Sequence, residues 1–287
     1  MTWAGNLHGH SYYCDGIESP EAYVQMALAK GHRFIGFSSH IPLAHHSSTW
    51  NMAPEKFFDY LNEIHQLKKD YSGLIKIFCG FEMDDPFSLY SCAELRDVYE
   101  DFVDYTVGSL HYAGTLPDGS LWEVDGATEK FMRGVDALCD GSIRKAVEVY
   151  FSRLREMLIQ SRPTVAGHLD KILIHEPVRE FQKAEPEFFD LLMGDLLSEV
   201  VRLGIVVEIN TRGLYTGRHN DYYPSRRHWL FLRKYQIPVV IHSDCHAPEE
   251  VDQLCQEAWE EALEHGLNVK TLPTSLACHI SDAPGPC

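Results

Sequence analysis

Short runs of β-branched and aromatic residues recur along the 287-residue chain, and a segment of helical periodicity follows each of them. Such runs are typical of buried strands, whereas apolar residues spaced three and four apart indicate amphipathic helices. The chain contains seven runs, at residues 3–8, 33–39, 74–82, 105–111, 164–168, 204–210 and 237–244. Strand and helix alternating in this way predict parallel βαβ units.

The segments between the runs contain helix boundaries. Ser91 and Glu94 have the spacing of a capping box, and residues 185–204 and 248–266 are amphipathic segments that each end in glycine. Residues 113–140 are long for a connection and rich in turn residues, which predicts an elaborated loop over the barrel mouth with one helix inside it. No Gly- or Pro-rich linker divides the chain, so we expect an α/β barrel in a single domain.

Composition narrows the class of protein. The formal net charge is −17, from 42 acidic and 25 basic residues, which argues against a nucleic-acid partner because such a surface repels phosphate backbones. No apolar run has the length of a membrane span, so no membrane association is expected. Eight cysteines without a C-x-x-C pair suit reduced thiols and predict a cytoplasmic protein. The oligomeric state stays open.

Histidine and carboxylate side chains stand at or just after the ends of most predicted strands. They are His8, His10, His40, Glu82, His111, His168, Glu208, Asp244 and His246. Barrel active sites form at the C-terminal ends of the strands, so these groups should meet at one rim. Each histidine alone could be an ordinary buried residue with a hydrogen bond. Burying all of these groups together would cost several kcal/mol each without a cation, which predicts two or three divalent metal ions with Glu82 as their bridge.

Seven short motifs in this order resemble those of the polymerase and histidinol phosphatase (PHP) superfamily, and most of all its monofunctional histidinol-phosphate phosphatases. The motifs are "HGHSYYCDG", "FSSHIPL", "GFEMD", "GSLHY", "GHLDK", "EINTRGL" and "HSDCHAP". The resemblance implies a distorted (β/α)7 TIM-like barrel, in agreement with the independent strand count. Residues 1–280 would form this metal-dependent phosphatase barrel, and residues 281–287 a loose C-terminal tail.

The resemblance also implies a trinuclear site of zinc, manganese or iron. One ion would be held by His8, His10, Glu82 and Asp244; a second by Glu82, His111 and His168; and the third by Asp15, His40 and His246. Glu82, Asp244 and His246 are assigned catalytic roles within this set. The implied reaction is hydrolysis of L-histidinol phosphate to L-histidinol and inorganic phosphate, a step of histidine biosynthesis, through attack by a hydroxide that bridges two ions.

Substrate-binding residues are less closely defined by the sequence. Arg212, Arg153 and Lys171 are candidates for binding phosphate, although each could be an ordinary surface base. Glu123 and Asp125 lie beside Trp122 in the long loop, where an aromatic wall with acids would suit a partly cationic imidazole; the alternative is two solvated loop acids.

Other functions share some of these features. A different small phosphomonoester could be the substrate, because the metal ligands do not contact the leaving group. An amidohydrolase-like C–N hydrolase also uses H-x-H on its first strand, but Glu82 on strand three and His40 on strand two fit the phosphatase pattern better. A metal-binding scaffold without activity is the non-enzyme alternative.

Overall fold

Eight parallel strands form one curled sheet in a computed structural model that describes residues 3–46, 48–84, 86–272 and 276. Their order is β1-β2-β3-β4-β7-β8-β9-β10. The strands are β1 (Gly5–Asn6), β2 (Phe34–Phe37), β3 (Lys76–Met83), β4 (Tyr105–Gly108), β7 (Val165–Ala166), β8 (Val206–Asn210), β9 (Pro238–His242) and β10 (Asn268–Val269). The predicted α/β barrel is therefore confirmed, and each of the seven predicted runs contains one strand.

The barrel is distorted because two different segments pair along the edge of β9 that faces away from β8: β10 at its beginning and the chain after β1 at its end. The short β10, which the sequence pattern does not predict, pairs with the beginning of β9 at Asn268 and Pro238. The chain that follows β1 reaches the other end of this edge, where Gly9 bridges to Cys245 and the His10 N–H donates to the Cys245 carbonyl at 2.8 Å. The barrel therefore closes at the C-terminal ends of its strands.

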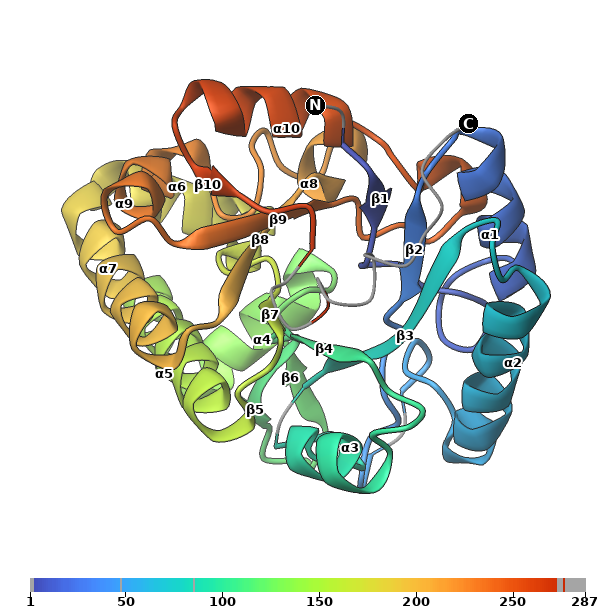
Figure 1. Ribbon diagram of the computed structural model, residues 1–287. Helices are drawn as coiled ribbons and strands as arrows, with labels where there is room; N and C mark the ends of the chain where they lie inside the picture. The colour runs from blue at the N-terminus through green and yellow to red at the C-terminus, as the bar shows by residue number, and fades with distance from the viewer. Residues whose placement is uncertain (1–2, 47, 85, 273–275, 277–287) are drawn as a thin grey trace.

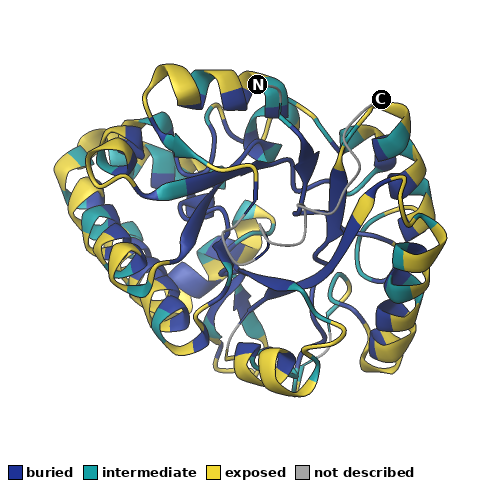
Figure 2. Cartoon of the chain, in the orientation of Figure 1, coloured by how far each residue is buried: buried dark blue, intermediate teal, exposed yellow. Residues whose placement is uncertain are grey.

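Helices accompany the sheet: most of them surround its outer face, whereas α4 is seen through the ring of strands (Figure 1). They are α1 (Pro20–Ala29), α2 (Phe57–Asp70), α3 (Cys92–Val98), α4 (Thr128–Leu138), α5 (Ile143–Ser161), α6 (Glu176–Ala184), α7 (Pro186–Leu203), α8 (Arg212–Tyr215), α9 (Trp229–Lys234) and α10 (Cys255–Glu264). The strands are buried, whereas the outward sides of the helices are exposed (Figure 2), as expected for a parallel sheet covered by helices. Among the described residues, no helix has both the length and the apolar character that a membrane span needs.

The predicted helix boundaries are partly correct. The capping box of Ser91 and Glu94 is present at the start of α3, and α7 fills residues 185–204 as predicted. The single helix expected over 248–266 is wrong: a short 3₁₀ turn comes first, and α10 starts only after Leu254, whose φ of +57° interrupts helical geometry. The predicted tail at 281–287 lies outside the described residues.

The barrel interior changes from apolar to polar along the strands. Side chains on a strand alternate between its faces, so Phe78 and Glu82 of β3 share one face, as do Val206 and Glu208 of β8. Phe78 and Val206 belong to a buried apolar cluster that also contains Ala4, Leu7, Phe34, Tyr105, Val107, Val165, Val240, Leu272 and Leu276. The polar groups thus follow the apolar ones toward the end where the barrel closes.

Residues 113–140 contain the expected helix, α4, and a hairpin that the sequence pattern does not predict. The hairpin pairs β5 (Tyr112–Thr115) with β6 (Leu121–Glu123). Trp122 is fully buried, and its indole Nε1–H donates to the Phe131 carbonyl at 3.0 Å. The Phe131 ring in turn stacks on His175 at 4.1 Å between centroids. These contacts fix the loop on the barrel.

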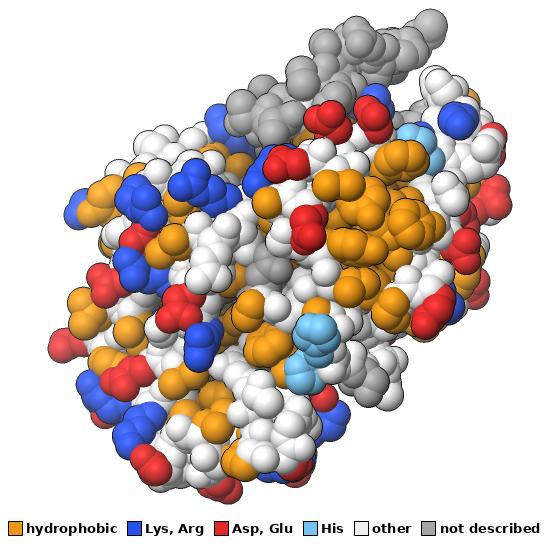
Figure 3. Space-filling model, turned by 90° about the horizontal axis from the view of Figure 1, so that it is seen from below, with side chains coloured by type: hydrophobic (Ala, Val, Ile, Leu, Met, Phe, Trp, Pro, Cys, Tyr) orange, Lys and Arg blue, Asp and Glu red, His pale blue; other side chains and the backbone are white. Residues whose placement is uncertain are grey.

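The molecular surface mixes charges of both signs. On the face seen from below, hydrophobic side chains gather where α2 and α3 lie side by side (Figure 3). The Phe58 side chain of α2 is 56% exposed and the Val98 side chain of α3 is 67% exposed, and Phe58 contacts Tyr99 beside it.

Packing against Trp122 makes Gly134 of α4 sensitive to a single methyl group. A Cβ at this position would lie 2.0 Å from the Trp122 Cδ1, so Gly134→Ala should destabilise the fold by about 1–3 kcal/mol. Gly194 of α7 is the matched control, because its Cβ would lie 3.6 Å from Phe231, an ordinary contact. Gly194→Ala should stabilise by roughly 0.5–1 kcal/mol through lower chain entropy. Urea unfolding measures both; equal changes would contradict the packing argument.

Candidate metal centre

The predicted metal ligands come together at the closed end of the barrel. His8, His10, Asp15, His40, Glu82, His111, His168, Asp244 and His246 all belong to groups whose potential ligand atoms lie within 4.8 Å of one another. The groups share members, so they form one continuous cluster. Its buried histidines and carboxylates suit a multinuclear metal site.

Glu82, near the end of β3, lies in the middle of this cluster and is 1% exposed. Each carboxylate oxygen contacts a different set of imidazoles. Oε2 lies 3.2 Å from His8 Nε2, 3.4 Å from His10 Nε2 and 3.1 Å from His40 Nδ1, and Oε1 lies 2.9 Å from His168 Nε2 and 3.4 Å from His111 Nε2. Because each oxygen faces its own set of imidazole rings, the Glu82 carboxylate has the geometry to bridge two metal ions, one on each oxygen.

Two outer carboxylates fix the orientation of ligand rings. His8 Nδ1 donates to Glu208 at 2.7 Å, and His111 Nδ1 donates to Asp84 at 2.6 Å. In both rings the other nitrogen, Nε2, is buried without a hydrogen bond and points toward Glu82. Metal-binding histidines typically donate their second ring N–H to a carboxylate in this way. The donor set and the unpaired nitrogens therefore fit divalent metal ions.

The cluster also perturbs the pKa values of its histidines. Burial alone lowers the pKa of His111, but the Asp84 and Glu82 carboxylates outweigh it and raise that pKa to about 9. Burial and the charge of His246 instead lower the pKa of His10 to about 4, which favours a neutral ring. The carboxylates thus attract positive charge into a buried site, and neutral rings such as His10 are the form that binds a cation.

The outer edge of the cluster depends on two unusual backbone positions. Asp15 lies 3.2 Å from the His246 ring, and Gly16 after it allows the turn, since a Cβ there would lie 2.5 Å from the His10 carbonyl. Asp244 has a φ of +54°, a strained value for a non-glycine residue, and its carboxylate lies 3.2 Å from His10 Nε2. Such strain often marks a functional position.

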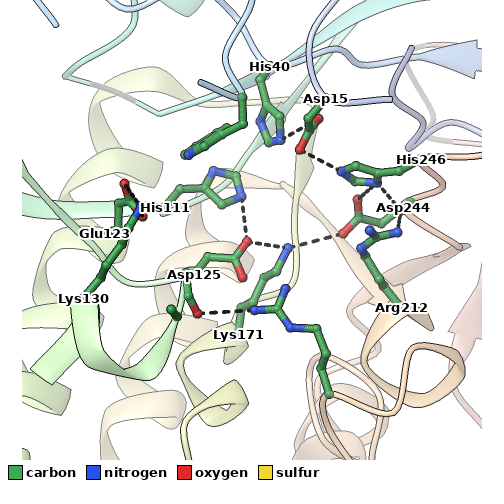
Figure 4. A pocket seen from close by; sticks show the side chains of 14 residues that line it. Asp15, His40, His111, Glu123, Asp125, Lys130, Lys171, Arg212, Asp244 and His246 are labelled. Carbon is green, nitrogen blue, oxygen red and sulfur yellow. Dashed lines mark hydrogen bonds and ion pairs between the residues drawn. The ribbon is translucent and has the colours of Figure 1, made fainter. Parts of the chain in front are cut away.

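A cavity of about 300 Å³ opens above the cluster (Figure 4). Its lining includes ligands of the cluster, the bases Lys130, Lys171, Arg212 and Arg218, the acids Glu123 and Asp125, and one aromatic side chain, Trp50. Lys171 Nζ lies 2.9 Å from Asp125 and 3.4 Å from Asp244, and Arg212 Nη1 donates to the Asp244 carbonyl at 2.8 Å. Both bases are thus held next to the cluster.

Some predicted site residues lie elsewhere. Arg153 is exposed on α5, pairs with Glu156 at 2.9 Å and lines a different cavity, so its expected role in binding phosphate at this centre is not supported. Trp122 belongs to the core, and Trp50 is the aromatic side chain of the cavity. Glu208, grouped with the ligands by sequence, lies behind His8 as its hydrogen-bond partner.

Other residues of the site are not predicted from the sequence. Asp84 closes the motif "GFEMD", two residues after Glu82, and that spacing could have indicated its role. His242, the last residue of β9, donates its Nδ1–H to Glu208 at 3.0 Å and stands two residues before Asp244. Trp50 and Arg218 come from loops, and no periodic pattern places them.

Comparison with known proteins agrees with this geometry. Residues 6–212 match the model of the PHP domain. The chain belongs to the PHP domain family. It is 26% identical over 264 residues to the histidinol-phosphatase of Bacillus subtilis, covering 85% of this chain and 94% of that protein. It is 21% identical over 258 residues to the histidinol-phosphatase of Saccharomyces cerevisiae, covering 80% and 72%.

A solved structure supports the fold of this family member. Histidinol phosphate phosphatase from Lactococcus lactis, complexed with zinc, L-histidinol and phosphate, matches with a TM-score of 0.68 and 20% identity, over 92% of this chain and 94% of that one. At this identity the likeness shows the shared distorted barrel.

The site geometry predicts that the purified protein binds between two and three equivalents of divalent metal. Glu82→Gln should lose more than one equivalent, because both of its oxygens face ligand rings. Elemental analysis after gel filtration measures the content, and Glu199→Gln is the control, because Glu199 of α7 pairs with Arg155 and Arg202 and belongs to none of the candidate metal-binding groups. One equivalent or none after reconstitution would rule out the multinuclear site.

Proposed function

We propose that the protein is a metal-dependent phosphomonoesterase that hydrolyses L-histidinol phosphate to L-histidinol and inorganic phosphate in histidine biosynthesis. The observation that carries the proposal is the cavity itself: a buried histidine and carboxylate cluster forms its floor, and Lys171 and Arg212 stand at its walls. Membership of the PHP domain family and the names of the relatives support it.

The proposed cofactors are two or three ions of zinc, manganese or iron. Glu82 would bridge them, with His8, His10 and Asp244 at one position, His111 and His168 at a second, and Asp15, His40 and His246 at a third. When bound, such ions polarise phosphoryl oxygens and lower the pKa of water. Glu82, Asp244 and His246 are proposed as catalytic, because Glu82 lies at the centre of the cluster and Asp244 and His246 line the cavity above it.

Lys171 and Arg212 would hold the phosphoryl oxygens. Arg212 Nη1 is fixed by the Asp244 carbonyl and by the Tyr215 hydroxyl at 2.9 Å, so the guanidinium keeps one position beside the cluster. The Lys171 ammonium is 9% exposed, and the surrounding carboxylates raise its pKa although burial opposes this. Both cations are therefore charged and held in place before substrate arrives.

The acids on the other wall would recognise the cationic amine of histidinol phosphate. Asp125 Oδ2 accepts from Lys171, whereas its Oδ1 is buried without a hydrogen-bond partner. Glu123 pairs with Lys130, whose side chain is 62% exposed and free to move away. A substrate ammonium could satisfy either carboxylate. A different small phosphomonoester remains the second candidate, because the phosphate side of the cavity does not contact the leaving group.

Phosphate release from histidinol phosphate by the metal-loaded protein tests the proposal. Arg212→Ala and Lys171→Met should each lower kcat/KM roughly 30- to 1000-fold, equivalent to about 2–4 kcal/mol of lost transition-state stabilisation. Arg153→Ala removes an exposed arginine with its own carboxylate partner and should leave kcat/KM unchanged. An equal loss in Arg153→Ala would contradict the assignment of the phosphate-binding bases.

Charge removal on the acidic wall should change specificity. Asp125→Asn and Glu123→Gln should each lower the ratio of kcat/KM for histidinol phosphate to that for p-nitrophenyl phosphate, because only the first substrate has a cationic tail. Asp118→Asn is the matched control, since Asp118 is an exposed acid of the same loop that pairs with Arg133. Equal losses on both substrates would show that the acids only shape the site.

A further inference from the structure

The loop after β2 brings one tryptophan edge-on against two rings of the metal centre. The Trp50 ring lies 4.5 Å from His40 and 5.3 Å from His111 between centroids, at interplanar angles of 71° and 74°. It also lines the cavity above the cluster. By contrast, Trp122 and Trp229 are fully buried in the hydrophobic core. Trp50 is thus placed to meet a molecule in the cavity.

The position of Trp50 is fixed by its own loop and by the neighbouring hairpin. Its indole stacks on Tyr112 of β5 at 5.1 Å and 13°. The Tyr112 hydroxyl lies 3.0 Å from Asn51 Oδ1 and 3.3 Å from Ser48 Oγ, and Asn51 Nδ2 donates to the Ile41 carbonyl at 3.0 Å. The backbone N–H of Trp50 donates to Ser48 Oγ at 3.2 Å. Little conformational entropy remains to be lost when a ligand binds.

The cavity has two chemically different sides (Figure 4). Arg212 and His246 lie on one side, and Glu123 and His111 lie on the other, with Lys171 and Asp125 between them. Trp50 packs on His40 and His111 and therefore lies toward the side that holds Glu123 and its partner Lys130. A phosphate drawn to Arg212 and Lys171 would direct its organic group toward an aromatic surface with carboxylates nearby.

From this arrangement we propose that Trp50 determines specificity by packing against the organic group of the substrate. The inference rests on the proposed function and names the residue that would select, among phosphomonoesters, those whose organic group is flat and cationic or weakly basic. Aromatic faces attract cations and stack on planar rings, and the carboxylates of Glu123 and Asp125 add to this attraction. Tyr112 acts as a positioning residue, because it holds the Trp50 ring in place.

A binding experiment tests the contact between Trp50 and the organic group without any catalytic turnover. Titration of the metal-loaded protein with L-histidinol should change its tryptophan fluorescence saturably. Trp50→Leu should remove this response and weaken binding measured by calorimetry about tenfold. Trp3→Phe is the control, because Trp3 lies outside the cavity and its indole donates to the Ile241 carbonyl. An unchanged response in Trp50→Leu would overturn the inference.

Kinetics with three esters give the second test. In Trp50→Leu, the ratio of kcat/KM for histidinol phosphate to that for glycerol phosphate should fall about tenfold, with p-nitrophenyl phosphate, which is flat but neutral, in between. Tyr112→Phe should lower the ratio for histidinol phosphate over glycerol phosphate by less than Trp50→Leu does, mainly by raising KM for histidinol phosphate. Equal losses on all three esters would overturn the inference. If the wild-type protein hydrolyses none of them, the proposed function fails, and the L-histidinol titration alone decides the role of Trp50.

Discussion

The structure depends on placing the Glu82 carboxylate, 1% exposed, at the centre of a barrel end. A buried carboxylate without a counter-charge costs several kcal/mol, so positive charge must surround it. Five imidazoles contact its two oxygens, and outer carboxylates such as Glu208 and Asp84 orient two of these rings from behind. Outward from Glu82, a layer of imidazoles is followed by a layer of carboxylates, and the three rings of His10, His40 and His168, whose pKa values burial lowers, are in the neutral form that binds divalent ions.

Closure of the barrel at one end makes this layering possible. The bridge between Gly9 and Cys245 places His8 and His10 beside Asp244, although more than 200 residues separate them in the chain. At the opposite end, β10 rather than β1 pairs with the start of β9, and apolar side chains fill the interior. Backbone pairing between the segments that follow β1 and β9 thus fixes the polar end of the barrel, whereas hydrophobic packing fills the other end.

The sequence predicts that these histidines and carboxylates come together, because most of them stand at or just after strand ends. Parallel strands end at the same rim of the barrel, so histidines and carboxylates at strand ends lie close to one another. Side chains from loops and helices lack this constraint. Trp122 and Trp50 look equivalent in the sequence, yet Gly134 leaves room for Trp122 in the core while Tyr112 holds Trp50 over the centre. Arg153 likewise lies away from the cavity above the cluster, because packing sets which way its helix face points.

Net charge also bears on the proposed substrate. A protein with a formal charge of −17 repels a free phosphate dianion at long range, and the local bases Lys171 and Arg212 act only over short distances. A phosphate ester with a cationic tail meets less repulsion, because its own positive charge reduces its net charge. Such a tail also suits Glu123 and Asp125 on the acidic wall. For the proposed substrate, a phosphomonoester with a compensating positive charge, long-range and short-range electrostatics therefore act in the same direction.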